Sequence, residues 1–345
     1  MGINNFHQFI KKKAPHVYRQ IYLNEYAGKR VAIDISGLIY KYKILNKDRW
    51  LDSFTYLIFA LRRNQIHPIF VYDGNAPKEK DNEKTKRSSH RKLLTDKVST
   101  LRDSLDAYYE TGEVKQSLQD TMVKLLKIPP TPLGVPINTS LLEKKYDQME
   151  SQIVHFSDEE LDSLNKLFDL CGIQYITSPV EAETLCSSMA LQGKADAVIS
   201  NDSDVCAYGV KKFLYEINGL NESAIEIDHD ELLKALEMTH PQFLDFCIMC
   251  GTDYNDNIPG IGPVNAYRLI KKHGCIENIP DIDVTILNHI RGRELFTPLL
   301  EYEDEVLSRK PSSIIEIYNF LRLKSSRIQM NTIEEAFRGP EILFE

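Results

Sequence analysis

The sequence of 345 residues lacks the usual marks of secreted or membrane-spanning proteins. It contains no run of eighteen apolar residues, so no helix is expected to cross a membrane. Its first residues lack the apolar stretch and small-residue cleavage site of a signal peptide. Only six cysteines occur, scattered through apolar segments, and we expect reduced, mostly buried thiols in an intracellular protein. Cys247 and Cys250 form the one C-x-x-C pair, but its helical apolar surroundings favour core packing over zinc binding.

The chain also lacks an excess of positive charge. Its 42 Lys and Arg residues stand against 50 Asp and Glu residues, a formal net charge of −8. Phosphate binding needs positive charge, so this balance argues at first against DNA as a partner. Residues 78–103 depart from the average, with nine basic and five acidic side chains and few apolar ones. A solvated, charged helix is the ordinary interpretation of such a run.

Apolar runs and helix signals alternate along the chain. Runs rich in β-branched residues predict strands at 30–35, 66–72, 174–177, 195–200 and 213–217. Apolar spacing and a capping-box pattern at Ser157 predict helices at 52–63, from 157 to a stop at Gly172, and at 181–192. The alternation predicts an α/β fold with a central mixed, mainly parallel sheet flanked by helices. The chain then turns mostly helical from about residue 230.

Acidic residues fall where these elements begin or end. They are Asp34, Asp73, Glu181, Glu183, Asp202, Asp204 and Asp253. Any one of them is ordinarily a turn residue or a helix cap. However, the carboxyl ends of parallel strands meet at the sheet edge where ligands bind. Crowded carboxylates repel one another, and oxygen ligands without His or Cys favour Mg²⁺ or Mn²⁺. The pattern therefore indicates a site for two divalent ions, as used in phosphoryl transfer.

Several short blocks of sequence occur in a distinctive order. They are residues 1–3, 31–34 with Tyr40 following, 69–74, 179–183, 201–204, 250–254 and 259–263. In this order they resemble the XPG/flap-endonuclease family of structure-specific 5′ nucleases. The resemblance implies a PIN-like nuclease core with a helical arch and a helix-turn-helix clamp on DNA. It divides the chain into core (1–76), arch (77–155, with a proline-rich stretch at 129–136), core (156–254), helix-hairpin-helix duplex-binding region (255–305) and tail (306–345).

The resemblance assigns roles to individual residues. It makes the seven acids metal ligands, with Asp34, Asp73, Glu181 and Asp202 counted as catalytic. Lys80 and Arg87 match a basic pair that reaches the scissile phosphate, and their spacing of seven puts them on one helix face. The expected DNA contacts are Gly2, Tyr40, Lys47, Gly260, Gly262, Arg268, Lys271 and Lys272. Tyr40 matches an aromatic that stacks on a base, with core packing as its alternative. A K⁺ ion is expected in the hairpin at 258–262.

The activity implied is Mg²⁺-dependent cutting of branched or flapped DNA near a single-strand/duplex junction, in replication and repair. The products would be a 5′-phosphate and a 3′-hydroxyl. A 5′–3′ exonuclease, a Holliday-junction resolvase, an RNA-directed nuclease and a non-catalytic branched-DNA scaffold stay open. We expect an intracellular monomer at the site of DNA replication, in the nucleus by resemblance, with a viral replication compartment or the cytoplasm also open.

The C-terminal segment carries a weaker pattern. Met330, Ile333 and Phe337 loosely resemble the family's peptide for binding a sliding clamp. The initial Gln of that peptide is missing, and Ala336 replaces its first aromatic residue. The alternative is an amphipathic helix that packs on the core.

Overall fold

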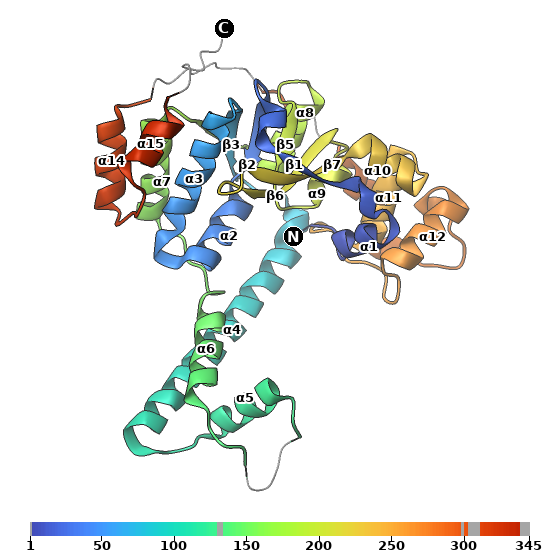
Figure 1. The fold of residues 1–345 in the computed structure, drawn as a ribbon. Coiled ribbons are helices and arrows are strands. Elements are labelled where there is room, and N and C mark those ends of the chain that lie inside the picture. The colour runs from blue at the N-terminus through green and yellow to red at the C-terminus, as the bar shows by residue number, and fades with distance from the viewer. Residues whose placement is uncertain (1, 130–133, 298–299, 303–310, 339–345) are drawn as a thin grey trace.

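The computed structural model describes residues 2–129, 134–297, 300–302 and 311–338. Its centre is a seven-stranded sheet (Figure 1). The strands are β1 (Tyr18–Tyr22), β2 (Arg30–Asp34), β3 (His67–Tyr72), β4 (Gln174–Thr177), β5 (Ala197–Ile199), β6 (Lys212–Asn218) and β7 (Ser223–Asp228). They are arranged in the order β1-β7-β6-β5-β2-β3-β4. The strands from β6 to β4 are parallel, whereas β7 and β1 pair antiparallel at one edge. This arrangement confirms the predicted mixed, mainly parallel sheet.

The strand register explains how the sheet positions a site. β2 pairs in parallel with both β3 and β5, and Ile33 lies beside Phe70 on one side and Ile199 on the other. The three strands therefore end at the same edge of the sheet. Asp34 ends β2, and the residues that follow β3 and β5 emerge beside it.

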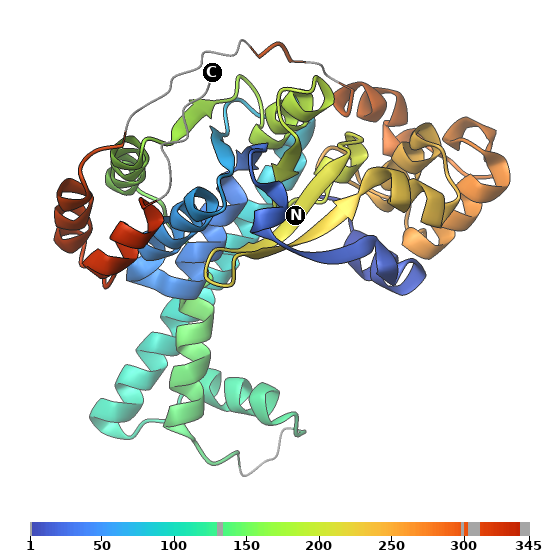
Figure 2. The same cartoon turned by 45° about the horizontal axis from the view of Figure 1, so that its top comes forward.

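Helices cover both faces of the sheet, as Figures 1 and 2 show. Ala32 belongs to one hydrophobic core, and its neighbours Val31 and Ile33 belong to the other. The first core includes α1 (Phe6–Lys13), α8 (Ala182–Leu191), α9 (Asp204–Ala207), α10 (His229–Leu236), α11 (His240–Cys250) and α12 (Pro263–His273). The second includes α2 (Ser36–Asn46), α3 (Trp50–Arg63), α7 (Asp158–Cys171), α14 (Ile314–Leu323) and α15 (Met330–Ala336). A short helix, α13 (His289–Leu295), packs against α11.

Three helices project from this body (Figure 1). They are α4 (Asp81–Thr111), α5 (Gln116–Leu126) and α6 (Thr139–Glu150). Near their tip they enclose a small core of their own, built on Leu101, Leu105, Leu118, Met122 and Leu142. Of the proline-rich stretch at 129–136, residues 130–133 lie outside the described residues, and 134–136 form neither helix nor strand.

Local sequence signals account for several element boundaries. Ser157 and Glu160 form the predicted capping box, and Gly172 ends the helix with a left-handed φ of 66°. Pro263 occupies the first turn of α12, where its missing N–H costs nothing. Strand β1 at the edge of the sheet, its neighbour β7 and helix α2 were not among the predicted elements.

The C-terminal helix α15 packs on the body of the protein. α15 packs against α3, with Ile333 and Ala336 buried. The Phe337 ring lies 4.2 Å from the Arg62 guanidinium and meets Phe59 edge-on. The segment is therefore an amphipathic helix packed on the core, as the alternative interpretation expected, and clamp binding through Met330–Phe337 stays a prediction. Among the described helices, none has the length and apolarity needed to span a membrane.

The described cysteines are all free. Five are buried and Cys275 is half-buried, which agrees with the expected reduced thiols. Cys247 and Cys250 lie on α11 within the first hydrophobic core.

Candidate active site

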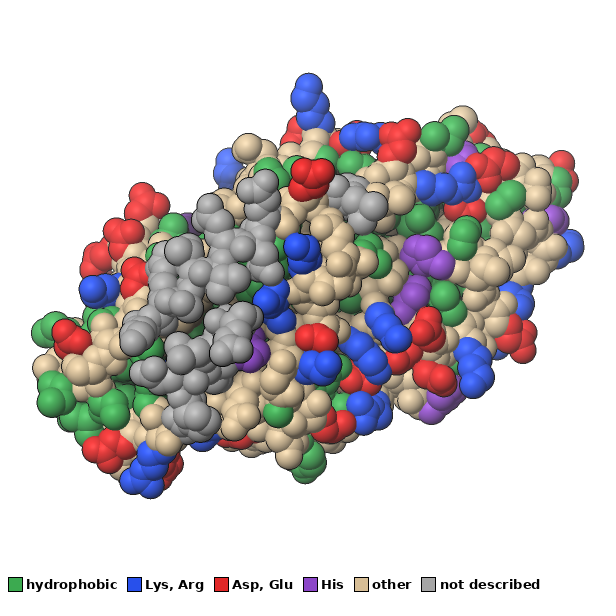
Figure 3. Space-filling view, turned by 90° about the horizontal axis from the view of Figure 1, so that it is seen from above, with side chains coloured by type: hydrophobic (Ala, Val, Ile, Leu, Met, Phe, Trp, Pro, Cys, Tyr) green, Lys and Arg blue, Asp and Glu red, His purple; other side chains and the backbone are tan. Residues whose placement is uncertain are grey.

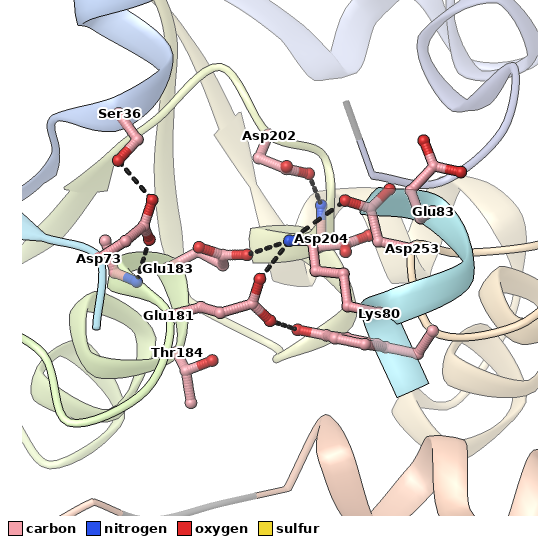
Figure 4. Close-up of polar contacts among 12 residues, drawn as sticks. Ser36, Asp73, Lys80, Glu83, Glu181, Glu183, Thr184, Asp202, Asp204 and Asp253 are labelled. Carbon is pink, nitrogen blue, oxygen red and sulfur yellow. Dashed lines mark hydrogen bonds and ion pairs between the residues drawn. The ribbon is translucent and has the colours of Figure 1, made fainter. Parts of the chain in front are cut away.

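The seven acids identified in the sequence gather at the carboxyl edge of the parallel strands, and Figure 4 labels all of them except Asp34. Asp34 ends β2, Asp73 follows β3, and Asp202 and Asp204 follow β5. Glu181 caps α8 and Glu183 lies in its first turn, while Asp253 follows the C-terminal end of α11. Six of the seven side chains are buried, and Asp73 is the exception. Tertiary structure thus brings together residues that are up to 219 positions apart (253 − 34).

Backbone and hydroxyl donors hold the first two aspartates in place. Asp34 accepts hydrogen bonds from the Ser36 N–H (3.0 Å) and the Ser200 hydroxyl (2.7 Å). Asp73 accepts hydrogen bonds from the Ala182 N–H (2.8 Å) and the Ser36 hydroxyl. The Asp73 bond joins the end of β3 to the start of α8, where Glu181 and Glu183 lie.

Burial and mutual repulsion raise the pKa of several of these acids. Burial, together with the nearby Asp73 carboxylate, raises the pKa of Asp34 to about 7. Burial and the neighbouring Asp202 and Asp253 carboxylates hold the pKa of Asp204 well above its ordinary value. Burial likewise raises the pKa of Glu183 well above its ordinary value, although Lys80 opposes the shift. The cluster therefore lacks enough positive charge of its own to keep all its carboxylates ionised at neutral pH.

Asp204 is the least compensated member of the cluster. Its side chain is fully buried, and neither carboxylate oxygen has a hydrogen-bond partner among the described residues. Leaving a buried carboxylate unpaired is costly, so such a group ordinarily faces a cation or takes up a proton. The oxygen-only character of the cluster suits Mg²⁺ or Mn²⁺ better than zinc.

Two basic side chains from the base of the projecting helices enter the cluster. Lys80 ends a short 3₁₀ turn before α4, and its ammonium contacts Glu181, lies 3.2 Å from Asp253 and lies 3.5 Å from Glu183. Burial lowers the pKa of Lys80, but the carboxylates of Glu183, Glu181 and Asp253 outweigh this and raise it. Arg87 lies on α4 and donates to Asp253 (2.7 Å) and Glu83 (2.9 Å). The two cations thus share one acid of the cluster, Asp253.

The Lys80 ammonium occupies the place between three of the carboxylates (Figure 4). Across the described residues, no three acidic, histidine or cysteine side chains already surround one point as metal ligands. The donor set fits a divalent cation, but a bound ion would require the Lys80 contacts to change.

The N-terminus also reaches the cluster. The Ile3 N–H donates to the Ser203 hydroxyl (2.9 Å), and Gly2 has a φ of +80°. A Cβ at Gly2 would overlap Asp202 Oδ1 and lie 2.8 Å from Asp204 Oδ1. Only glycine fits this close approach without displacement.

The remaining predicted DNA contacts lie on several surfaces of the protein. Tyr40 is 43% exposed on α2, so the alternative of a core tyrosine is wrong. Lys47, after α2, is exposed and lies 3.9 Å from Glu150 at the end of α6. Gly260 needs its left-handed φ of +80°, whereas Gly262 caps α12 with an ordinary φ of −92°. The remaining three, Arg268, Lys271 and Lys272, are exposed on α12, and Lys271 pairs with Glu237 (3.1 Å).

Comparisons with known proteins assign this chain to a family. Residues 1–94 match the XPG N-terminal domain and residues 172–253 match the XPG I-region. The chain is 32% identical to "Probable RAD2-like endonuclease 369L" of Invertebrate iridescent virus 6, over 96% of this chain and 89% of that protein. The chain belongs to the XPG/flap-endonuclease family. This XPG-family chain is also 31% identical to Flap endonuclease 1 of Lodderomyces elongisporus, over 81% of this chain and 68% of that protein.

Solved structures share the fold of this XPG-family chain. The catalytic core of Rad2 in complex with DNA substrate matches with a TM-score of 0.67 and 17% identity, over 98% of this chain and 99% of that chain. Flap endonuclease-1 from Methanococcus jannaschii matches with a TM-score of 0.60 and 20% identity, over 93% and 95%. At these identities the comparison establishes the fold alone.

The structure adds residues that the sequence reading of this XPG-family chain missed. Ser36 and Ser200 bond to the clustered aspartates, and the Tyr254 hydroxyl donates to Glu181 (2.7 Å). Each serine stands two residues from a clustered aspartate, the spacing of a local side-chain to backbone turn. That spacing is a usable signal for the serines. A second group, Lys86, His90 and Arg91, lines a pocket of about 470 Å³ at the base of α4.

Proposed function

We propose that this protein is a divalent-metal-dependent 5′ flap endonuclease acting in DNA replication or repair. The observation that carries the proposal is the convergence of seven carboxylates with Lys80 and Arg87 at one edge of the sheet. The family membership and the flap endonuclease relatives support the same activity. The products would be a 5′-phosphate and a 3′-hydroxyl.

The metal ligands are proposed to be the seven acids already named, holding two Mg²⁺ or Mn²⁺ ions. Bound ions would supply an activated water and stabilise charge on the reacting phosphate. The unpartnered Asp204 oxygens and the raised pKa values of Asp34 and Glu183 support a cation here, because a cation lets these groups ionise.

Lys80 and Arg87 are proposed to contact the phosphate in the transition state. Both side chains already reach the carboxylate cluster from one helical segment, so they need only exchange acidic partners for phosphate oxygens. Positive charge held in place where negative charge develops stabilises a transition state without further reorganisation. Tyr40 would stack on a base beside the cut, which its exposure permits.

The same reasoning divides the chain into functional parts. Residues 1–76 and 156–254 would form the nuclease core, 77–155 the arch and 255–305 the duplex-binding region, followed by the tail. Gly2, Lys47, Gly260, Gly262, Arg268, Lys271 and Lys272 would contact DNA. A K⁺ ion in the 258–262 hairpin, a monomeric state and a location at the site of DNA replication remain predictions.

A flap is preferred over other branched substrates because of the helices above the site. The small core near the tip of α4, α5 and α6 holds the three helices together, and Lys80 just before α4 reaches the carboxylates. Basic side chains at the base of α4 line a pocket suited to a single strand. An exonuclease or a junction resolvase of the same family would show its preference when flap, nicked and four-way DNA are offered at equal concentration. An RNA duplex tests the RNA-directed alternative.

The decisive experiment is Asp202→Asn with 5′-flap cleavage measured in Mg²⁺. We expect a loss of cleavage with binding retained, because Asn keeps the shape but removes a ligand charge. Asp230→Asn, which changes an exposed acid in the first turn of α10, is the control and should cut like the parent. An Asp202→Asn protein that cuts at the parent's rate would refute the metal assignment. A parent that binds flaps but cuts no nucleic acid would favour the scaffold.

A further inference from the structure

A groove of about 500 Å³ runs between α1 and α12, beside the 258–262 hairpin. The two helices lie side by side in Figures 1 and 2. Phe9 and Tyr267 contact each other across the groove, with ring centroids 5.6 Å apart. Lys12 and Lys13 contribute to one wall and Arg268 to the other, and no acidic side chain is among the described lining residues.

The cations of this groove differ from those at the active site. Lys80, Lys86 and Arg87 are each paired with acids. In contrast, Lys12 and Arg268 are exposed, and within the described residues neither has an acidic partner at salt-bridge distance. Lys13 places its ammonium 4.9 Å from the centre of the Tyr267 ring. The groove therefore presents uncompensated positive charge on both walls, in a protein whose net charge is −8.

The groove is also tied closely to the acidic cluster. α1 follows Gly2 and Ile3, which contact the loop that carries Asp202 and Asp204. The Asn4 N–H donates to the Gly251 carbonyl (3.0 Å), just before Asp253. A molecule held in the groove is thus held at a fixed distance from the carboxylates.

We propose that this groove binds the phosphate backbone of duplex DNA, so that α1 forms one wall of the duplex-binding surface. The inference rests on the proposed nuclease function and extends it from the hairpin to α1. Lys ammonium groups suit phosphates because they are point charges without a required geometry. Stacking of a single strand is disfavoured, because Phe9 is buried and Lys13 covers the Tyr267 ring.

Salt dependence of binding provides a direct test. Each phosphate contact contributes about 0.9 to the slope of log K against log salt for duplex DNA. We expect Lys12→Ala and Arg268→Ala each to reduce the slope by about 1, and the double variant to reduce it by about 2. Binding would be measured by fluorescence anisotropy with Ca²⁺ on a labelled 5′-flap DNA and on its single strand. Affinity for the single strand should change by less than about twofold.

A matched control removes the same charge elsewhere. Lys166→Ala with Arg322→Ala takes an exposed lysine from α7 and an exposed arginine from α14, which lie on the opposite side of the body from the groove in Figure 1, and should leave the slope on the flap DNA unchanged. All positions are exposed, and thermal melts should show that every variant folds. A groove variant with the parent's slope, or with an equal loss on the single strand, would overturn the proposal. The nuclease proposal fails separately, if the parent does not cut a flap in Mg²⁺, whatever the slopes show.

Discussion

Gly2 lies where any side chain would collide with two proposed metal ligands. A Cβ at this position would overlap Asp202 Oδ1 and lie 2.8 Å from Asp204 Oδ1. Those carboxylates are only 4% and 0% exposed, so neither has room to swing into solvent. Gly2→Ala must therefore displace either the acids or the start of the chain.

Two costs add in this variant. The φ of +80° at Gly2 costs an alanine about 1 kcal/mol. The collision adds about 1–3 kcal/mol, as overpacking of a close-packed site does. The melting temperature should fall by several degrees. The effect on catalysis should be larger, because a displacement of about 1 Å in a reacting group costs about 100-fold in rate.

Gly28→Ala separates these two costs. Gly28 has a φ of +73°, but a Cβ there would meet nothing within 4 Å. It carries the same backbone strain without the collision, so it should melt slightly lower than the parent and cleave at the parent's rate. Single-turnover cleavage of a 5′-flap DNA in Mg²⁺ and Mn²⁺ binding by calorimetry are the readouts. If Gly2→Ala matches Gly28→Ala in both, the close approach of Gly2 to the acids has no functional role.

Three further predictions concern the acids and the projecting helices. Lys80→Met should bind Mn²⁺ more tightly in calorimetry yet cut more slowly, because an ammonium that competes for Glu181 and Asp253 is gone; unchanged affinity would contradict this. The folded pKa of Asp34, about 7, lies above that of an unfolded Asp, so the folded state binds the extra proton. The melting temperature of the metal-free protein should therefore fall between pH 5 and 7, and Mg²⁺ should raise it more at pH 8 than at pH 6. Leu118→Ala should cost the arch core about 2–5 kcal/mol and speed hydrogen exchange in α5, while Mn²⁺ affinity stays at the parent's value.

The central strands and the helix caps were predictable because their signals are local. β2 and β3 are buried on both faces, so their apolar residues run without interruption. β1 was missed for the opposite reason. β1 buries only Ile21 along its five residues, which leaves no periodic apolar pattern to detect. α2 follows β2 after a single residue and has no side-chain cap, so neither a turn nor a capping residue marks its start.

The acids of the site were predictable from their positions at the ends of elements, but their partners were not. Asp34 lies near Asp73 and Asp202 because β2 pairs in parallel with β3 and β5, and the strand pattern indicates this parallel pairing. The insertion of Lys80 among Glu181 and Asp253 depends on the angle at which α4 leaves the core. That angle is set by packing between distant residues, and the sequence contains no local signal for it.

The distribution of charge connects the two proposals. Three basic residues at the base of α4 are paired with the protein's own acids: Lys80 and Arg87 with Asp253, and Lys86 with Asp256. The phosphates of DNA would have to replace these acids as the partners of the basic side chains. Bound metal would help by binding the carboxylates in their place. The groove cations Lys12 and Arg268 need no such exchange. Initial binding should then depend on salt through the groove, and positioning for cleavage should depend on the divalent ion. Chelation of the metal should accordingly reduce cutting far more than it reduces the salt slope of binding, and an equal loss of both would show that the groove does not act independently of the active site.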